Sequence, residues 1–216
     1  MKLYGYYRSS TSYRLRLALQ LKGLEYQNCP VNLLEAQQKG EPFKSRNPFA
    51  TVPMLAVDGK DRVQSMAIIE WLDEAYPQEP LLPADIEQRY LARELAYAIA
   101  TELHAPLNVP VLKYLKTEYG QDQEGVNTWY RHWLARTLVP VEQRLAQLDT
   151  GDFLFDTPGF FEVVLMPQIY NARRFGYDFS DAPHTTRIEA ACLALDAVQR
   201  AHPDNQNDTP EGETVQ

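Results

Sequence analysis

The segment that most constrains this fold is a short apolar stretch that runs straight into a cluster of hydroxyl side chains and then into a helix. Residues 2–7 have the length and the apolar-aromatic character of a β-strand. Four consecutive Ser and Thr side chains follow at 9–12, and a helix-forming run continues to about residue 22. Such a junction forms an anion site, because unpaired backbone N–H groups and the helix dipole both favour negative charge. The segment therefore predicts either a site for a thiolate or oxyanion or, as the alternative, an ordinary helix cap.

The composition is that of a globular chain, with 44% hydrophobic and 23% charged residues among 216. The net charge of −8 argues against a nucleic-acid partner, since phosphate binding needs a basic face. No apolar run approaches the roughly 20 residues that cross a bilayer. The first apolar stretch is short and ends at Arg8, which does not fit a signal peptide. We therefore expect a cytoplasmic protein without a membrane partner.

The cysteines and histidines show no pattern of a metal site. Cys29 and Cys192 lie far apart and outside any Cys-x-x-Cys pattern, and the four histidines are scattered. We expect both cysteines to be free thiols and predict no metal.

Hydrophobic periodicity predicts an α/β unit followed by a helical one. Strands are expected at 2–7, 26–31, 51–57 and, after the Asp58-Gly59 turn, from 62, with helices over 12–22 and from Ser65 to about 76. Beyond a linker at 80–83, helices are expected over 85–119, 122–149, 159–175 and 184–201, with kinks or interruptions at Pro106, Pro110 and Pro140. The predicted domains are therefore 1–80 and 85–203, and the polar tail 204–216 is expected to be disordered.

Several segments, taken together, resemble the zeta-class glutathione transferases, which are the maleylacetoacetate and maleylpyruvate isomerases. The resemblance covers nearly the whole chain. It implies a fold of the α/β plus all-α kind, with a thioredoxin-like N-terminal domain and a helical C-terminal domain. The segments that carry it are Arg8-Ser9-Ser10-Thr11-Ser12-Tyr13-Arg14-Leu15-Arg16-Leu17-Ala18-Leu19, Asn47-Pro48-Phe49-Ala50-Thr51-Val52-Pro53-Met54-Leu55, Gln64-Ser65-Met66-Ala67-Ile68-Ile69-Glu70-Trp71-Leu72, Leu81-Leu82-Pro83, His104-Ala105-Pro106-Leu107-Asn108, Pro167-Gln168-Ile169-Tyr170-Asn171-Ala172-Arg173-Arg174-Phe175, Ala201-His202-Pro203 and Asp208-Thr209-Pro210.

The resemblance implies that glutathione is the cofactor and that the N-terminal domain binds it. Ser9, Ser10 and Thr11 would lie beside the sulfur as catalytic and binding residues. Thr11 stands where zeta-class enzymes commonly have Cys, so a thiol at this position is not essential if the chain is active. Val52 would pair its backbone with the cysteinyl part of glutathione, as an added strand does, and Pro53 would follow a cis peptide bond.

The resemblance places the other end of glutathione at a second helix start. Gln64 and Ser65 would hold the γ-glutamyl group, with a carboxylate at the helix N-terminus. The alternative for Ser65 is plain helix capping. Gln38 is a further implied contact. His104 and Asn108 lie four residues apart, so on a helix both could face the cleft between the domains; the alternative for this pair is a solvated helix face.

Arginines are the candidates for binding an anionic substrate, because a guanidinium offers planar, bidentate donors. Arg8 precedes the hydroxyl cluster, and the resemblance points to Arg174, the arginine directly before Phe175, rather than to Arg173. The alternative for each of them is a surface ion pair.

The activity implied by the resemblance is glutathione-dependent cis–trans isomerisation of a maleyl keto diacid in the catabolism of aromatic amino acids or other aromatic compounds. The implied mechanism is reversible conjugate addition of the thiol, rotation about the resulting single bond, and elimination. Two alternatives remain open: a general glutathione transferase or peroxidase, and a non-catalytic transferase-fold regulator that binds other proteins. A homodimer is implied by the resemblance alone.

Overall fold

The computed structural model describes residues 1–148 and 150–210, and the chain divides into two compact units. The first unit combines the two ends of the chain, Met1–Leu82 and the residues from Leu193 onward, and the second spans Pro83–Cys192. The division at residue 82 falls in the predicted linker. The predicted boundary at 203 differs from this division, in which the residues from Leu193 onward group with the first unit.

A four-stranded sheet with the order β2-β1-β3-β4 forms the frame of the first unit. The strands are β1 Lys2–Gly5, β2 Gln27–Pro30, β3 Met54–Val57 and β4 Lys60–Val63. β1 runs parallel to β2 and antiparallel to β3, which is antiparallel to β4. Asp58 and Gly59 both have positive φ in the two-residue turn between β3 and β4, as a tight hairpin requires. The predicted thioredoxin-like arrangement is confirmed.

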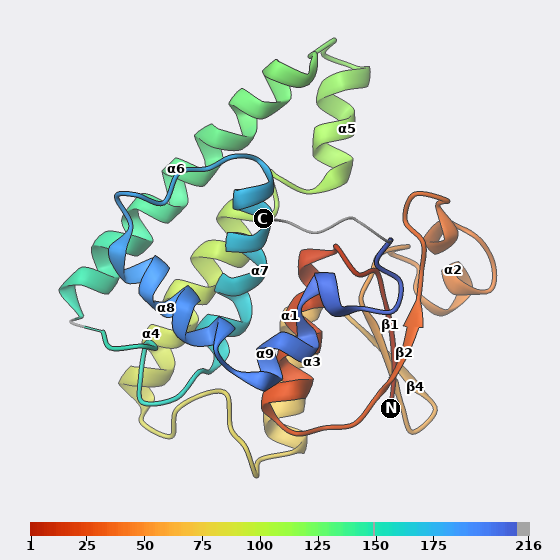
Figure 1. Cartoon of the computed structure of the whole chain (residues 1–216). Coiled ribbons are helices and arrows are strands. Elements are labelled where there is room, and N and C mark those ends of the chain that lie inside the picture. Colours follow the sequence, from red (N-terminus) through yellow and green to blue (C-terminus); the bar gives the residue numbers. More distant parts are fainter. Residues whose placement is uncertain (149, 211–216) are drawn as a thin grey trace. The chain divides into compact units, whose positions relative to one another are not determined.

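Helices α1 (Ser10–Leu21), α3 (Ser65–Ala75) and α9 (Asp196–Ala201) pack together beside this sheet, as Figure 1 shows. The shorter elements of the unit are η1 Gln37–Lys39, α2 Phe43–Arg46 and η3 Pro203–Asn205. Strand and helix side chains that are fully buried form the core of the unit: Leu3, Leu15, Leu19, Met54, Leu55, Ile68, Ile69 and Leu72.

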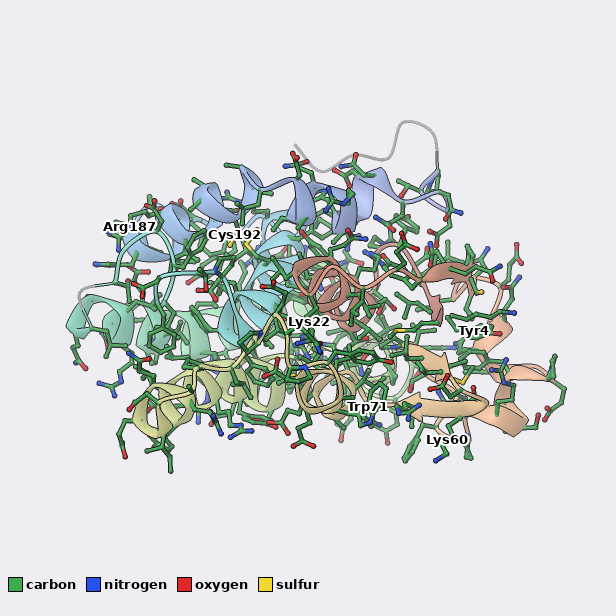
Figure 2. The ribbon with its side chains drawn as sticks, turned by 90° about the horizontal axis from the view of Figure 1, so that it is seen from below. Tyr4, Lys22, Lys60, Trp71, Arg187 and Cys192 are labelled. Carbon is green, nitrogen blue, oxygen red and sulfur yellow. The ribbon has the colours of Figure 1, made fainter. Side chains whose placement is uncertain are left out.

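A buried ion pair anchors the chain where it leaves the first unit. The Lys22 ammonium, labelled in Figure 2, donates to Asp73 Oδ1 at 3.0 Å and to the Glu79 carbonyl at 2.6 Å. The same carboxylate accepts the backbone N–H groups of Leu81 and Leu82. One carboxylate therefore ties the end of α1 and the linker to α3.

The second unit is helical throughout its regular structure. Its elements are α4 Ile86–Tyr97, the π-helical turn η2 Ala98–Leu103, α5 Val109–Thr117, α6 Gln123–Gln147, α7 Phe160–Arg174 and α8 Pro183–Leu193. The helix predicted over 85–119 is interrupted between Leu103 and Val109, beside Pro106 and Pro110, as expected. Pro140 does not interrupt α6. The single helix predicted over 184–201 is instead two helices, α8 and α9.

The prediction of disorder from residue 204 differs from the structure over 204–210. These residues form η3 and a following turn, in which the Gln206 side-chain amide donates to the carbonyl groups of Arg200 and His202. The polar composition that suggested disorder instead supplies hydrogen bonds. Residues 211–216 of the predicted tail lie outside the described part of the chain.

Candidate active site

Ser9 lies at the junction between β1 and α1, as the sequence predicts. It is the N-cap of α1, with extended backbone angles, and its Oγ accepts the Ser12 N–H at 3.3 Å. Gly5 allows the strand to pass close to the helix, because a Cβ at this position would lie only 3.2 Å from the Ser12 side chain. Ser10, the first residue of α1, is buried. The local sequence thus places a hydroxyl at a helix N-terminus.

A chain of hydrogen bonds joins this junction to the loop before β3. Ser9 Oγ lies 3.0 Å from Thr11 Oγ1, which in turn donates to the Val52 carbonyl at 2.9 Å. Because Thr11 has one hydroxyl proton and gives it to Val52, the Ser9 hydroxyl is the donor in the first bond. Rotation about the Cβ–Oγ bond lets the Ser9 hydroxyl donate to a different acceptor instead. Ser9, Thr11 and Val52 therefore lie together.

The Val52–Pro53 peptide bond is cis, which confirms the expectation from the family resemblance. Asn47, a residue that the sequence reasoning missed, organises the loop before it. Its buried side chain donates to the Thr51 carbonyl at 2.7 Å and accepts the Phe49 N–H at 3.2 Å. The Asn-Pro dipeptide at 47–48 is a turn signal that could have pointed to this role.

Gln64 and Ser65 form the start of α3 in an unusual conformation. Gln64 has φ 72° and ψ 105°, a strained backbone for a residue with a side chain, and its side chain does not cap the helix. Strain of this kind is concentrated at binding sites. Without a side-chain cap, the first N–H groups of α3 remain available to an anion. The geometry is suited to a carboxylate.

Gln38 lies apart from this group in its hydrogen bonding. It belongs to η1, and among the described residues its buried Oε1 has no hydrogen-bond partner. Within the described part of the chain, Gln38 forms no hydrogen bond with Ser9, Val52 or Gln64. An acceptor without a partner is compatible with a ligand contact, but its role in glutathione binding stays a prediction.

His104 and Asn108 are not on one continuous helix, so the helical spacing expected for them is wrong. His104 follows η2, and Asn108 is the N-cap of α5, with extended backbone angles and its Oδ1 accepting the Val109 N–H at 2.9 Å. The residues between them form turns, because Pro106 and Pro110 do not allow the helix to continue.

Arg173 and Arg174, neighbours at the end of α7, have different surroundings. Arg173 donates from Nε to Glu189 Oε1 at 2.8 Å and from Nη2 to Oε2, and these bonds hold the pKa of Arg173 above its ordinary value. Arg173 is therefore engaged in a structural ion pair with α8. Arg174 instead acts on Tyr130: burial raises the pKa of this phenol, and the charge of Arg174 partly offsets the rise. Arg8 belongs to the other unit, and its Cζ lies 5.8 Å from the centroid of the Tyr7 ring.

The described residues include no group of three or more His, Cys, Asp or Glu side chains that could hold a metal. Cys29 is half-buried and Cys192 buried, and both are free thiols; burial raises the pKa of Cys192. Within the described residues, no helix combines the length and the apolar character needed to cross a membrane.

Comparison with known proteins gives a consistent result over the whole chain. Residues 1–74 match the model of the glutathione S-transferase N-terminal domain. The chain is 43% identical to the maleylacetoacetate isomerase of Pseudomonas aeruginosa over 213 residues, which covers 97% of this chain and 99% of that protein.

Two solved structures extend the comparison. The holo structure of a maleylpyruvate isomerase, described as a bacterial zeta-class glutathione S-transferase, has a TM-score of 0.95 and 40% identity, with 97% and 100% of the two chains covered. A maleylacetoacetate isomerase from Methylobacterium extorquens AM1, with bound malonate and glutathione, has a TM-score of 0.92 and 36% identity, with the same coverage of 97% and 100%.

Proposed function

The chain belongs to the zeta class of the glutathione S-transferase family, and from this premise we propose that it is a glutathione-dependent cis–trans isomerase of a maleyl keto diacid. The observation that carries the proposal is the near full-length likeness to isomerases, together with a site that fits their cofactor. Maleylacetoacetate and maleylpyruvate are the two candidate substrates, since relatives of both names match over nearly their whole length.

The residues of the first unit fit glutathione. The uncapped N-terminus of α3, with Ser65, offers N–H donors to the γ-glutamyl carboxylate, and the strained Gln64 would hold the adjacent amino group. The backbone of Val52, presented by the cis loop, would bind the cysteinyl part. Ser9, at the N-terminus of α1, would then lie beside the sulfur.

Glutathione would supply a thiol nucleophile that adds reversibly to the double bond. An ordinary thiol has a pKa of about 8.5, so the protein must favour the thiolate near neutral pH. The Ser9 hydroxyl supplies a donor and α1 supplies its positive dipole end, and both lower a thiol pKa. Thr11 fixes the position of the Ser9 hydroxyl relative to the Val52 carbonyl through its two hydrogen bonds.

Arg8 and Arg174 would each bind a carboxylate of the diacid. The protein carries a net charge of −8, so local guanidinium groups must supply the attraction for a dianion. The engagement of Arg173 with Glu189 supports the choice of Arg174. The bound malonate in the Methylobacterium relative supports a dicarboxylate as the second ligand.

We also propose a homodimer located in the cytoplasm. Ile86 and Tyr90, one turn apart on α4, are exposed apolar side chains that a second subunit could cover. The two free cysteines are compatible with a reducing compartment.

The direct test supplies each candidate diacid together with glutathione and follows the trans product by proton NMR. The expected result is enzyme-dependent isomerisation of at least one of the two, with kcat/KM identifying the preferred acid. Retention on a glutathione resin without isomerisation of either diacid would contradict the proposal and favour a binding protein.

A further inference from the structure

The C-terminal segment, residues 203–210, folds back onto the first unit and reaches the loop that carries Ser9. It is held in place by its own hydrogen bonds: the Thr209 hydroxyl donates to the Pro203 carbonyl, and the Asn205 amide donates to the Gln199 carbonyl at 2.8 Å. Asp208 lies within this anchored turn, one residue before Thr209. A residue more than 190 positions from Ser9 in the sequence can therefore act on the same loop.

Asp208 binds the backbone next to the catalytic residue. Its Oδ2 accepts the Tyr7 N–H at 2.9 Å, two residues before Ser9. The carbonyl of the same Tyr7 accepts from Arg16 Nη2 at 2.7 Å, and Arg16 Nε donates to the Ala201 carbonyl at 2.8 Å. The peptide groups on both sides of Tyr7 are thus fixed by side chains, so the chain leaves this residue toward Arg8 and Ser9 in a defined direction.

The two oxygens of the Asp208 carboxylate have different surroundings. Within the described residues, its second oxygen, Oδ1, is buried and has no hydrogen-bond partner. A buried charged oxygen without a partner is destabilising, and such groups are rare in folded proteins. The carboxylate holds the Tyr7 peptide through Oδ2, while Oδ1 makes no hydrogen bond among the described residues.

We propose that Asp208 is a positioning residue, which holds the loop between β1 and α1 so that the Ser9 hydroxyl is aimed at the glutathione sulfur. The inference rests on the proposed function, because it assumes that glutathione binds at Ser9. Asp208 acts through the Tyr7 peptide and does not itself touch the reacting atoms.

The test compares three variants of the full chain. Asp208→Ala removes the acceptor, Asp208→Asn keeps an oxygen that can accept the Tyr7 N–H, and Asn207→Ala is the matched control. Asn207 is the neighbouring residue of the same segment, but it bonds to the Asn28 side chain at the protein surface and not to the loop. The measurements are the titration of the bound glutathione thiol by thiolate absorbance, the glutathione Kd, the kcat for the diacid, and the melting temperature.

For Asp208→Ala we expect a higher pKa of the bound thiol and a kcat lowered about tenfold, because a 1 Å misplacement of a catalytic group can cost about 100-fold and a smaller shift costs less. The glutathione Kd should stay within about threefold, because the α3 and Val52 contacts remain. Asp208→Asn should largely restore the thiol titration, and Asn207→Ala should match the wild type.

A lower melting temperature in Asp208→Ala with an unchanged thiol titration would overturn the inference, since Asp208 would then be merely structural. An equal loss in Asp208→Asn, or a shift as large in Asn207→Ala, would overturn it as well. The thiol titration needs no diacid. If the wild type fails to isomerise but Asp208→Ala still shifts the titration, the proposed function fails and the inference stands.

Discussion

Ser9 combines two roles at one position, and they can be separated. As the N-cap of α1 it accepts the Ser12 N–H, and as the proposed catalytic residue it donates to the glutathione thiolate. Ser9→Ala should lower isomerase turnover about tenfold or more, from the loss of a charge-assisted hydrogen bond that contributes about 1.5–3 kcal/mol. The thiol of bound glutathione should titrate at higher pH, which thiolate absorbance measures directly.

Asp85→Ala is the matched control for the capping role. Asp85 is the N-cap of α4 and accepts the N–H groups of Glu87 and Gln88. Both variants should lose about 1 kcal/mol of stability, but only Ser9→Ala should change the thiol titration. An unshifted titration in Ser9→Ala would remove Ser9 from the catalytic role.

The two arginines proposed to bind the diacid, Arg8 and Arg174, give the sharpest test of the substrate contacts. Replacing Arg8 or Arg174 with Met removes the charge but keeps the bulk of the side chain, and should raise the KM for the diacid about tenfold or more. The glutathione Kd should stay nearly unchanged. Steady-state kinetics with each substrate varied in turn will separate the two effects.

Arg173→Met is the internal control, and it should lower the melting temperature because it breaks the ion pair with Glu189. Its KM for the diacid should remain that of the wild type. If the KM instead responds to Arg173 and not to Arg174, the assignment of the substrate contact at this helix end is incorrect.

At the scale of elements, the Glu142 carboxylate stabilises the N-terminus of a neighbouring helix, α8. Glu142 lies on α6. Its Oε1 accepts the His184 backbone N–H and lies 2.7 Å from His184 Nδ1, and its Oε2 accepts the Thr185 backbone N–H and the Thr185 hydroxyl. Burial opposes ionisation of Glu142, but these hydrogen bonds outweigh it and hold its pKa below the ordinary value. Ionised Glu142 thus stabilises the N-terminus of α8.

The sign of the pH effect follows from the lowered pKa of Glu142. The stabilisation is complete above the pKa of an unfolded Glu, about 4.3, and is lost as the pH falls through the lower folded value. Glu142→Gln should therefore lower the melting temperature at pH 7 by roughly 3–10 °C, and the difference from wild type should shrink below about pH 4. Thermal melting of the wild type and Glu142→Gln at a series of pH values measures this difference. Glu74→Gln, at an exposed position on α3, is the control; a constant difference for Glu142→Gln at every pH would contradict the explanation.

The elements differ in how far the sequence could predict them. Alternating and helical periodicity were sufficient for the sheet and the main helices, because their core positions recur at fixed spacing. The helix break between Leu103 and Val109 could be predicted from its prolines, but the split between α8 and α9 carries no such signal. The cis bond before Pro53 was predictable only from family resemblance, since nothing local distinguishes it.

Sequence reasoning missed the roles of Asn47 and Asp208 for different reasons. Asn47 acts within its own loop and carried a turn signal, whereas Asp208 reaches Tyr7 across almost the whole sequence. A polar C-terminal stretch has the composition of a disordered tail, and only its hydrogen bonds to the first unit show otherwise.

At the scale of the whole molecule, the central claim is that the chain uses glutathione without consuming it. The unit that contains Ser9, Val52 and Gln64 is built from both ends of the chain, so residues after Leu193 belong to the unit that carries the proposed cofactor site. A conjugating transferase could use the same residues to activate a thiol. The fate of glutathione is what separates the two activities.

The most direct measurement incubates the protein with a maleyl keto diacid in large excess over glutathione, and follows the diacid and total free thiol together. The predicted result is complete conversion of the diacid to its trans isomer, with the amount of free glutathione unchanged at the end. Glutathione lost in step with the diacid, or conversion that stops once glutathione is exhausted, would contradict the isomerase assignment.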